Sequence, residues 1–241
     1  MENDVMIRLD KYISENYPCA RSEAKKIIVS GKVSVDGIVI KKPESKIDEA
    51  SEVVCLGKTL KLNKGLYYML NKPAGYISAV RDDKQKTVTD LFPPEIAGKI
   101  FPVGRLDKDT EGLLLMTDDG DFCHRIESPK KGVVKTYYAR TEGKISADAR
   151  ERFKSGIEFS DFTSKPAEIE ILSEEGANCE VRVKVSEGKF HQVKKMLHAV
   201  GAEVVYLKRI SVGGLALDEG LASGEYRELS EEEIKLLIEE H

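Results

Sequence analysis

The sequence lacks the features of a membrane or secreted protein. None of its apolar runs approaches the roughly 18 residues that a transmembrane helix requires. Its first residues, MENDVMIRLDKY, are acidic where a signal peptide is basic and then apolar. We therefore expect a cytoplasmic protein with no membrane partner. The 241 residues, 41% hydrophobic and 33% charged, have an ordinary globular composition that allows one large domain or a small and a medium one.

The sequence also has few candidate ligands for metals, disulfides or nucleotides. Its cysteines are Cys19, Cys55, Cys123 and Cys179. They stand 36, 68 and 56 positions apart, so we expect reduced and mostly buried thiols. Cys123 is followed by His124, and His191 and His198 are seven positions apart, but neither pair is part of a set of four ligands. GKTL at residue 57 lacks the spacing of a phosphate-binding loop. We predict no metal and no cofactor.

The net charge of −4 is unevenly distributed along the chain. From Asp218 to the end, nine acidic residues face only Arg227 and Lys235, a local charge of −7, so residues 1–217 carry +3. Residues 21–46 form a basic patch in which seven lysines and arginines, Lys25, Lys26, Lys41 and Lys42 among them, outnumber three acidic residues. This distribution allows a polyanionic partner despite the acidic average.

Residues 1–62 are predicted to form a small module of two helices and a hairpin. The first helix lies within MIRLDKYISENY, and the second, EAKKIIVS, has Ser22 as its expected N-cap and Gly31 as its end. VSVDGIVI places Asp36 and Gly37 at the turn of a hairpin that requires positive φ at both positions. A unit of this size has a thin core, so we expect it to serve in attachment and not in chemistry.

Residues 63–241 are predicted to form a larger α+β domain. Strands are expected at LYYML from Leu66, at 112–117, at 136–141 and at 179–186. A helix is expected over 189–201, with Phe190, Val193, Met196, Leu197 and Val200 as its apolar stripe and with Lys194 and Lys195 facing outward. A last helix begins after Ser230 as N-cap and packs through Ile234, Leu237 and Ile238.

The densest group of polar residues is GRLDKDTEGLLL at 104–115. An arginine, two aspartates and two glycines precede a buried strand, an arrangement in which a rigid scaffold holds one acid in a fixed pose. Asp107 is thus a candidate catalytic carboxylate. A turn whose aspartates bond their own backbone explains the same residue types.

Two further segments contain candidate RNA contacts. EGKFHQVKKM at 187–196 gathers basic residues at the start of a helix, which is also typical of a solvated helix face. KTYYAR at 135–140 sets Tyr137 and Tyr138 beside cations, where an aromatic ring can stack on a base or, more commonly, pack in the core.

In their order and spacing these segments resemble the RsuA-type bacterial ribosomal RNA pseudouridine synthases, which join an S4-like RNA-binding module to a catalytic domain. The resemblance spans nearly the whole chain and includes NKPAGYIS at 71–78, GRLDKDTEGLLLMT at 104–117, KTYYA at 135–139 and EGKFHQVKKM at 187–196. It implies a mixed, largely antiparallel sheet with flanking helices in the second domain. It also implies the isomerisation of uridine to pseudouridine without a cofactor or metal.

The resemblance also implies roles for individual residues. Asp107 would be the catalytic aspartate, Tyr137 the ring packed on the target base and Lys189 the basic partner of Asp107. Arg105 would enter the RNA helix where the uridine has left it, and Lys72 would belong to a supporting motif in contact with RNA. Lys194 and Lys195 are expected to bind RNA as well.

The substrate suggested by the resemblance is a uridine of small-subunit (16S) rRNA, free or in a partly assembled subunit, bound by a monomer. HRIESP at 124–129 and HQVKKM at 191–196 favour this branch over the large-subunit branches, which carry an arginine-rich segment at the second place. Large-subunit (23S) rRNA is the second choice and tRNA the third. Two alternatives belong to other functional classes. One is a non-catalytic ribosome assembly factor, and the other is a glycoside hydrolase that uses Asp107 with Asp109.

Overall fold

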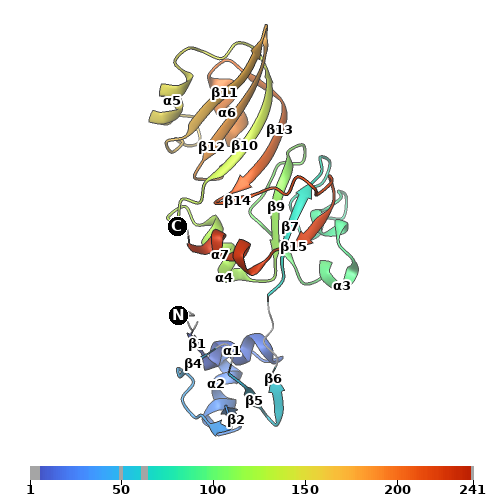
Figure 1. The fold of residues 1–241 in the computed structure, drawn as a ribbon, viewed down its shortest axis with the longest axis vertical. Helices are drawn as coiled ribbons and strands as arrows, with labels where there is room; N and C mark the ends of the chain where they lie inside the picture. Colours follow the sequence, from blue (N-terminus) through green and yellow to red (C-terminus); the bar gives the residue numbers. More distant parts are fainter. Residues whose placement is uncertain (1–5, 49–50, 61–64, 240–241) are drawn as a thin grey trace. The chain divides into compact units, whose positions relative to one another are not determined.

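The computed structural model describes residues 6–48, 51–60 and 65–239. The chain divides into two compact units, residues 1–64 and 65–241 (Figure 1). The predicted boundary between residues 62 and 63 lies outside the described residues.

The first unit packs two helices against short strands. Its elements are β1 (Met6–Arg8), α1 (Leu9–Asn16), α2 (Arg21–Val29), β2 (Val33–Val35), β3 (Ile38–Val39), β4 (Lys46–Asp48), β5 (Val53–Cys55) and β6 (Lys58–Leu60). Strands β3, β2, β5 and β6 form one sheet in that order, and β1 pairs with β4. Its small core is continuous from the helices to the sheet, with Leu9, Ile13, Ile28 and Val53 fully buried.

The turn between β2 and β3 has the predicted geometry, with φ of +49° at Asp36 and +80° at Gly37. Gly31 follows α2 with φ of +74°, as expected for a glycine that ends a helix. Two predictions for this unit are wrong. Residues 6–8 form a strand and not the first turn of a helix, and α2 begins at Arg21 after Ala20, so Ser22 is not its N-cap.

A buried carboxylate connects three segments of the first unit. Asp10 of α1 is fully buried, and its oxygens lie 2.9 Å from Arg8, 3.0 Å from Arg21 and 4.0 Å from Lys25. The hydrogen bond from Arg8, together with Arg21, outweighs burial and holds the pKa of Asp10 well below its usual range. The ionised carboxylate therefore stabilises the arrangement of β1, α1 and α2.

The second unit is built on one large mixed sheet (Figure 1). Its strands are β7 (Tyr67–Lys72), β8 (Phe101–Val103), β9 (Glu111–Thr117), β10 (Lys135–Glu142), β11 (Glu168–Glu175), β12 (Asn178–Val185), β13 (Glu203–Val212), β14 (Leu215–Ala216) and β15 (Tyr226–Glu228). The strand order is β11, β12, β10, β13, β9, β7, β15. Among the ladders between described strands only β9 and β13 run parallel, which confirms the largely antiparallel α+β fold.

Helices cover this sheet, and strand β9 is buried on both faces. The helices are a 3₁₀ turn (Val88–Leu91), α3 (Pro94–Ala97), α4 (Gly120–Glu127), α5 (Ala149–Ser155), α6 (Gln192–Ala199) and α7 (Glu231–Glu239). Leu114 and Met116 of β9 belong to the core on one face, and Leu113 and Leu115 to the core on the other. Burial on both faces explains the continuous apolar run of this strand.

The parallel contact of β9 with β13 depends on a glycine. Gly112 has φ of +97°, and a Cβ there would lie 2.2 Å from the carbonyl oxygen of Arg209 on β13. Only glycine permits this approach. The close approach at Gly112 places the loop before β9 beside strand β13.

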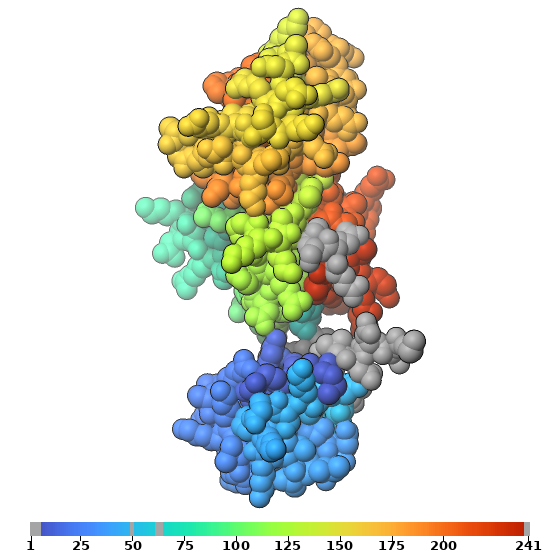
Figure 2. Space-filling model, turned by 90° about the vertical axis from the view of Figure 1, so that its left-hand side faces the viewer, coloured from blue at the N-terminus to red at the C-terminus, as the bar shows by residue number. Residues whose placement is uncertain are grey.

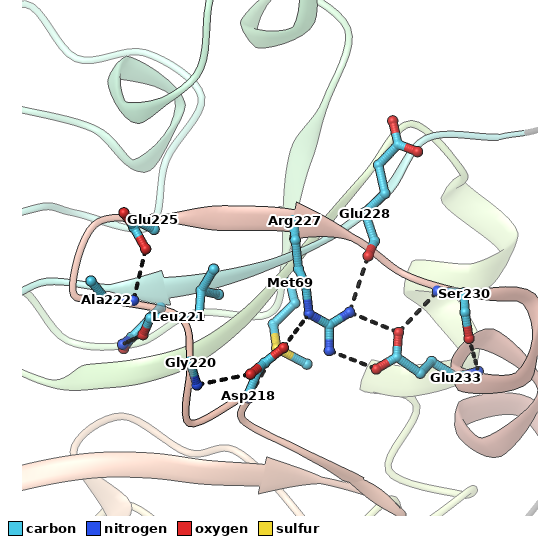
Figure 3. Close-up of polar contacts among 11 residues, drawn as sticks. Met69, Asp218, Gly220, Leu221, Ala222, Glu225, Arg227, Glu228, Ser230 and Glu233 are labelled. Carbon is cyan, nitrogen blue, oxygen red and sulfur yellow. Dashed lines mark hydrogen bonds and ion pairs between the residues drawn. The ribbon is translucent and has the colours of Figure 1, made fainter.

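An arginine connects distant parts of the C-terminal segment that begins at Asp218. Arg227 of β15 donates to Asp218 at 2.7 Å and makes a two-pronged pair with Glu233 at 2.8 and 2.9 Å (Figure 3). Ser230 caps α7 as predicted, since its hydroxyl accepts from the Glu233 amide. Ile234, Leu237 and Ile238 pack into the core, also as predicted. Figure 2 shows α4 and this segment (yellow-green and red) at one end of the second unit, with α5 at the other.

Candidate active site

The loop between β8 and β9 carries Asp107, and a buried lysine fixes the backbone of this loop. Lys72, at the end of β7, is fully buried. Its ammonium donates to four carbonyl oxygens, those of Pro73 (3.1 Å), Asp107 (3.0 Å), Lys108 (3.3 Å) and Thr110 (2.7 Å). Burial lowers the pKa of Lys72 to about 8, although nearby aspartate and glutamate charges oppose this shift. Lys72 therefore holds the backbone of the Asp107 loop and cannot contact RNA, which corrects its predicted binding role.

Two cationic or ionisable side chains from α6 and its N-cap face the carboxylate of Asp107. Lys194 Nζ lies 3.2 Å from Oδ2, and His191 Nε2 lies 3.6 Å from Oδ1. Lys194 also donates to Asp109 at 2.6 Å. Burial lowers the pKa of Lys194, but its hydrogen bond to Asp109 and the charge of Asp107 outweigh burial, so the pKa lies above its ordinary value. Lys194 is therefore a cation shared by two aspartates.

The turn before α6 directs these side chains. Gln192 is buried, its amide oxygen accepts from the Lys189 N–H at 2.9 Å, and its amide nitrogen donates to buried Glu187 at 2.9 Å. His191 is the N-cap and adopts a left-handed backbone with φ of +53°. The helix thus begins at Gln192, three residues later than predicted, and its phase turns Lys194 toward Asp107.

These elements line one open cavity of about 60 Å³. Its lining includes Asp107, Lys194, His191 and Thr110, together with Tyr137 of β10. Tyr137 is buried, so its ring is held by the sheet. The buried Thr110 hydroxyl has no hydrogen-bond partner within the described residues, which leaves a polar group for a ligand. Arg105 is exposed at the cavity lining.

Not every predicted site residue has its expected contact. Lys189 lines the cavity and is exposed but makes no ion pair with Asp107; Lys194 occupies that place. The predicted outward orientation of Lys194 is wrong for the same reason. Lys195 pairs instead with Asp161 at 2.7 Å and lies 5.2 Å from the Phe162 ring. Within the described residues, no three His, Cys, Asp or Glu side chains are grouped as metal ligands.

The predicted basic patch lies on the surface of the first unit. All six lysines of residues 21–46 are exposed, among them Lys25, Lys26, Lys41 and Lys42. Lys25 is also 4.0 Å from the buried Asp10, so part of its charge is balanced.

None of the helices in the described parts of the chain has the length and hydrophobicity needed to span a membrane. The four cysteines are free thiols, of which Cys55 and Cys179 are buried.

Comparisons with known proteins match both units. The model of the RNA pseudouridylate synthase family matches residues 66–199, the region that contains the cavity, and the S4 domain model matches residues 7–54. The chain belongs to the RNA pseudouridine synthase family. Its activity is therefore the conversion of uridine in RNA to pseudouridine, and the S4 unit provides RNA binding.

Full-length relatives agree with this assignment. The synthase is 44% identical over 236 residues to the uncharacterized RNA pseudouridine synthase YtzG of Bacillus subtilis, covering 97% of this chain and 99% of that one. It is 40% identical to ribosomal small subunit pseudouridine synthase A of Escherichia coli, covering 96% and 100%. A crystal structure of a pseudouridylate synthase, 38% identical, superposes with a TM-score of 0.69 over 96% of this chain and all of the other.

Sequence reasoning missed His191 and Gln192 in the synthase and expected Lys194 to face outward. The one available signal was that all three lie together in the polar segment EGKFHQVKKM. Their roles depend on the left-handed backbone at His191, which residue types alone do not indicate.

Proposed function

We propose that the synthase isomerises a uridine of small-subunit ribosomal RNA. The observation that carries this proposal is the near full-length match to the Escherichia coli protein named for the ribosomal small subunit. The HQVKKM segment at 191–196 supports it, with histidine and lysines where large-subunit branches are rich in arginine. The S4 unit, with its basic patch, would supply most of the affinity for rRNA.

In this proposal Asp107 is the acting group. The reaction breaks the bond between uracil N1 and ribose C1′, turns the base and joins C5 to C1′; C5 loses a proton and N1 gains one, so the product is an isomer. Nothing is oxidised and no group leaves the RNA. The Asp107 carboxylate would act either as nucleophile on C1′ or as base on the C2′ proton. Lys194 and His191 would keep it oriented toward the cavity, and Lys72 would fix its backbone.

The remaining residues of the cavity would handle the extracted nucleotide. A base must leave its stack to reach Asp107, at a cost of a few kcal/mol. Packing on the Tyr137 ring would offset part of this cost, and the exposed Arg105 would fill the gap in the RNA. The hydroxyl of Thr110 provides one unoccupied hydrogen-bonding group in the wall of the cavity.

Mapping of pseudouridines in rRNA from cells with and without the gene tests the substrate. Loss of one pseudouridine from the small-subunit rRNA is expected. Loss from the large-subunit rRNA or from tRNA would move the substrate to that RNA, and no loss in any RNA would favour an assembly role without catalysis. A cytoplasmic location and a monomeric state also belong to this proposal.

A further inference from the structure

One aromatic side chain beside the cavity, Phe190, does not pack in the hydrophobic core. Of the nine tyrosines and seven phenylalanines, all within the described residues, only Phe190 is exposed. Its exposed fraction is 72%, although the helical period predicted it for the apolar stripe. The remaining members of that predicted stripe, Val193, Met196, Leu197 and Val200, are buried. Phe190 therefore does not contribute to stability in the way that its neighbours do.

The ring of Phe190 stacks on His191, a residue with an unusual backbone conformation. His191 has φ of +53°, a conformation that costs a residue other than glycine about 1 kcal/mol or more and that clusters at functional sites. The two rings are stacked, with centroids 3.8 Å apart and planes inclined by 19°. The far edge of His191 reaches Asp107 at 3.6 Å. A stack of two rings thus extends from the catalytic carboxylate to solvent.

We propose that the outer face of Phe190 is a stacking platform for an unpaired RNA base adjacent to the uridine that enters the cavity. This inference rests on the RNA substrate of the proposed function. A nucleotide next to an extracted one loses a stacking partner, and the platform replaces that partner. Every base has a π-face, so the contact is tolerant of sequence.

Charge at the platform also suits a nucleic acid. Lys195 Nζ lies 5.9 Å from the Phe190 ring centroid and is kept in place by Asp161. In the proposed function the cavity receives the uridine, and its lining includes His191 of the stack, so the next nucleotide of the same strand would pass the rim of the cavity. The other end of the stack lies at Asp107, which favours an RNA base at Phe190 over a protein partner, because a protein that binds Phe190 would gain nothing from this connection.

The first test separates stacking from bulk. We expect Phe190→Ala and Phe190→Leu to lower kcat/KM for pseudouridine formation on a transcript of small-subunit rRNA by roughly 5- to 150-fold, the range for loss of one base stack. Phe190→Tyr keeps the aromatic face and should stay near the unsubstituted protein. The loss should appear in KM and not in kcat. Leu172→Ala, at another exposed apolar position, is the matched control.

The second test does not depend on knowing the modified uridine. The sequence has no tryptophan, so Phe190→Trp introduces a single fluorophore at the platform, and Leu172→Trp gives a control elsewhere on the same unit. Oligouridylate should quench the fluorescence of Phe190→Trp, whereas heparin, which carries charge without bases, should not. Leu172→Trp should respond to neither.

The outcomes distinguish the platform from the proposed function. If the unsubstituted protein modifies the transcript and Phe190→Ala matches it, the platform is wrong and the function stands. If oligouridylate binds by filter assay without quenching Phe190→Trp, the platform is likewise wrong. If the unsubstituted protein modifies no rRNA but quenching is selective for oligouridylate, the rRNA assignment fails and the platform stands.

Discussion

Replacing Lys72 by methionine should damage catalysis far more than stability. The side chain is fully buried, and its ammonium bonds four carbonyl oxygens of the chain around Asp107. Methionine has a similar length and no donor. The loop would keep its sequence and lose the group that fixes its backbone.

The expected change in stability is small because two terms oppose each other. The three N–H donors of the ammonium are shared among four carbonyl oxygens, and at roughly 1.5 kcal/mol per charged donor their loss destabilises the folded state by roughly 4 kcal/mol. Relief from burying the charge returns about 3 kcal/mol at pH 7, since the pKa of Lys72 falls from 10.5 to about 8. The net loss of about 1 kcal/mol lowers Tm by about 2–4 °C for a unit of this size.

The loss of activity is larger because Asp107 must be placed accurately. A shift of about 1 Å in a reacting group costs on the order of 100-fold in rate. Tritium release from rRNA labelled at uridine C5 measures the rate, and circular dichroism measures Tm. Lys154→Met, which removes an exposed charge from α5, is the control. An active Lys72→Met variant, or one that loses activity only by unfolding, would refute this reasoning.

Three further predictions concern charged side chains. Lys194→Met should lower kcat roughly tenfold or more, and Lys189→Met should lower it less, in the same tritium assay; equal losses would count against Lys194 as the partner of Asp107. Asp10→Asn should destabilise the first unit by about 3 kcal/mol in urea unfolding. In the unsubstituted protein the stabilisation by Asp10 is complete above its ordinary pKa of 3.8 and is lost as pH falls through its lower folded-state pKa, so a midpoint that is constant below pH 4 would disprove it. Neutralising the exposed patch should flatten the salt dependence of rRNA binding by about 0.7–0.9 per phosphate contact, and an unchanged slope in filter binding would exclude its lysines: Lys25, Lys26, Lys41 and Lys42.

The sequence was sufficient to predict features that depend on local chemistry. The turn at Asp36 and Gly37, the cap at Ser230 and the strand predicted at 112–117 follow from residue types and their period. The structure confirms them, with the strand observed as β9. The place of Asp107 in a loop that leads into a buried strand also follows, because glycines and an apolar run surround it; the cavity beside it was not predicted from these residues.

Features that depend on distant segments were not predictable. Lys72 is buried because a loop 35 residues later in the chain provides its acceptors. The resemblance alone had implied Lys189 as the partner of Asp107, and the helix had been expected to begin at residue 189. The left-handed His191 delays that start and changes which lysine faces the cavity. No periodic pattern encodes such a backbone angle.

The most direct test of the central claim is pseudouridine formation by Asp107→Asn, measured beside rRNA affinity by filter binding. The substitution is nearly isosteric and removes one negative charge from the cavity, so affinity should stay level or rise slightly while turnover is abolished from about pH 6 to 9. Substantial turnover by Asp107→Asn, or loss of folding in place of loss of catalysis, would contradict the assignment of Asp107 as the acting group.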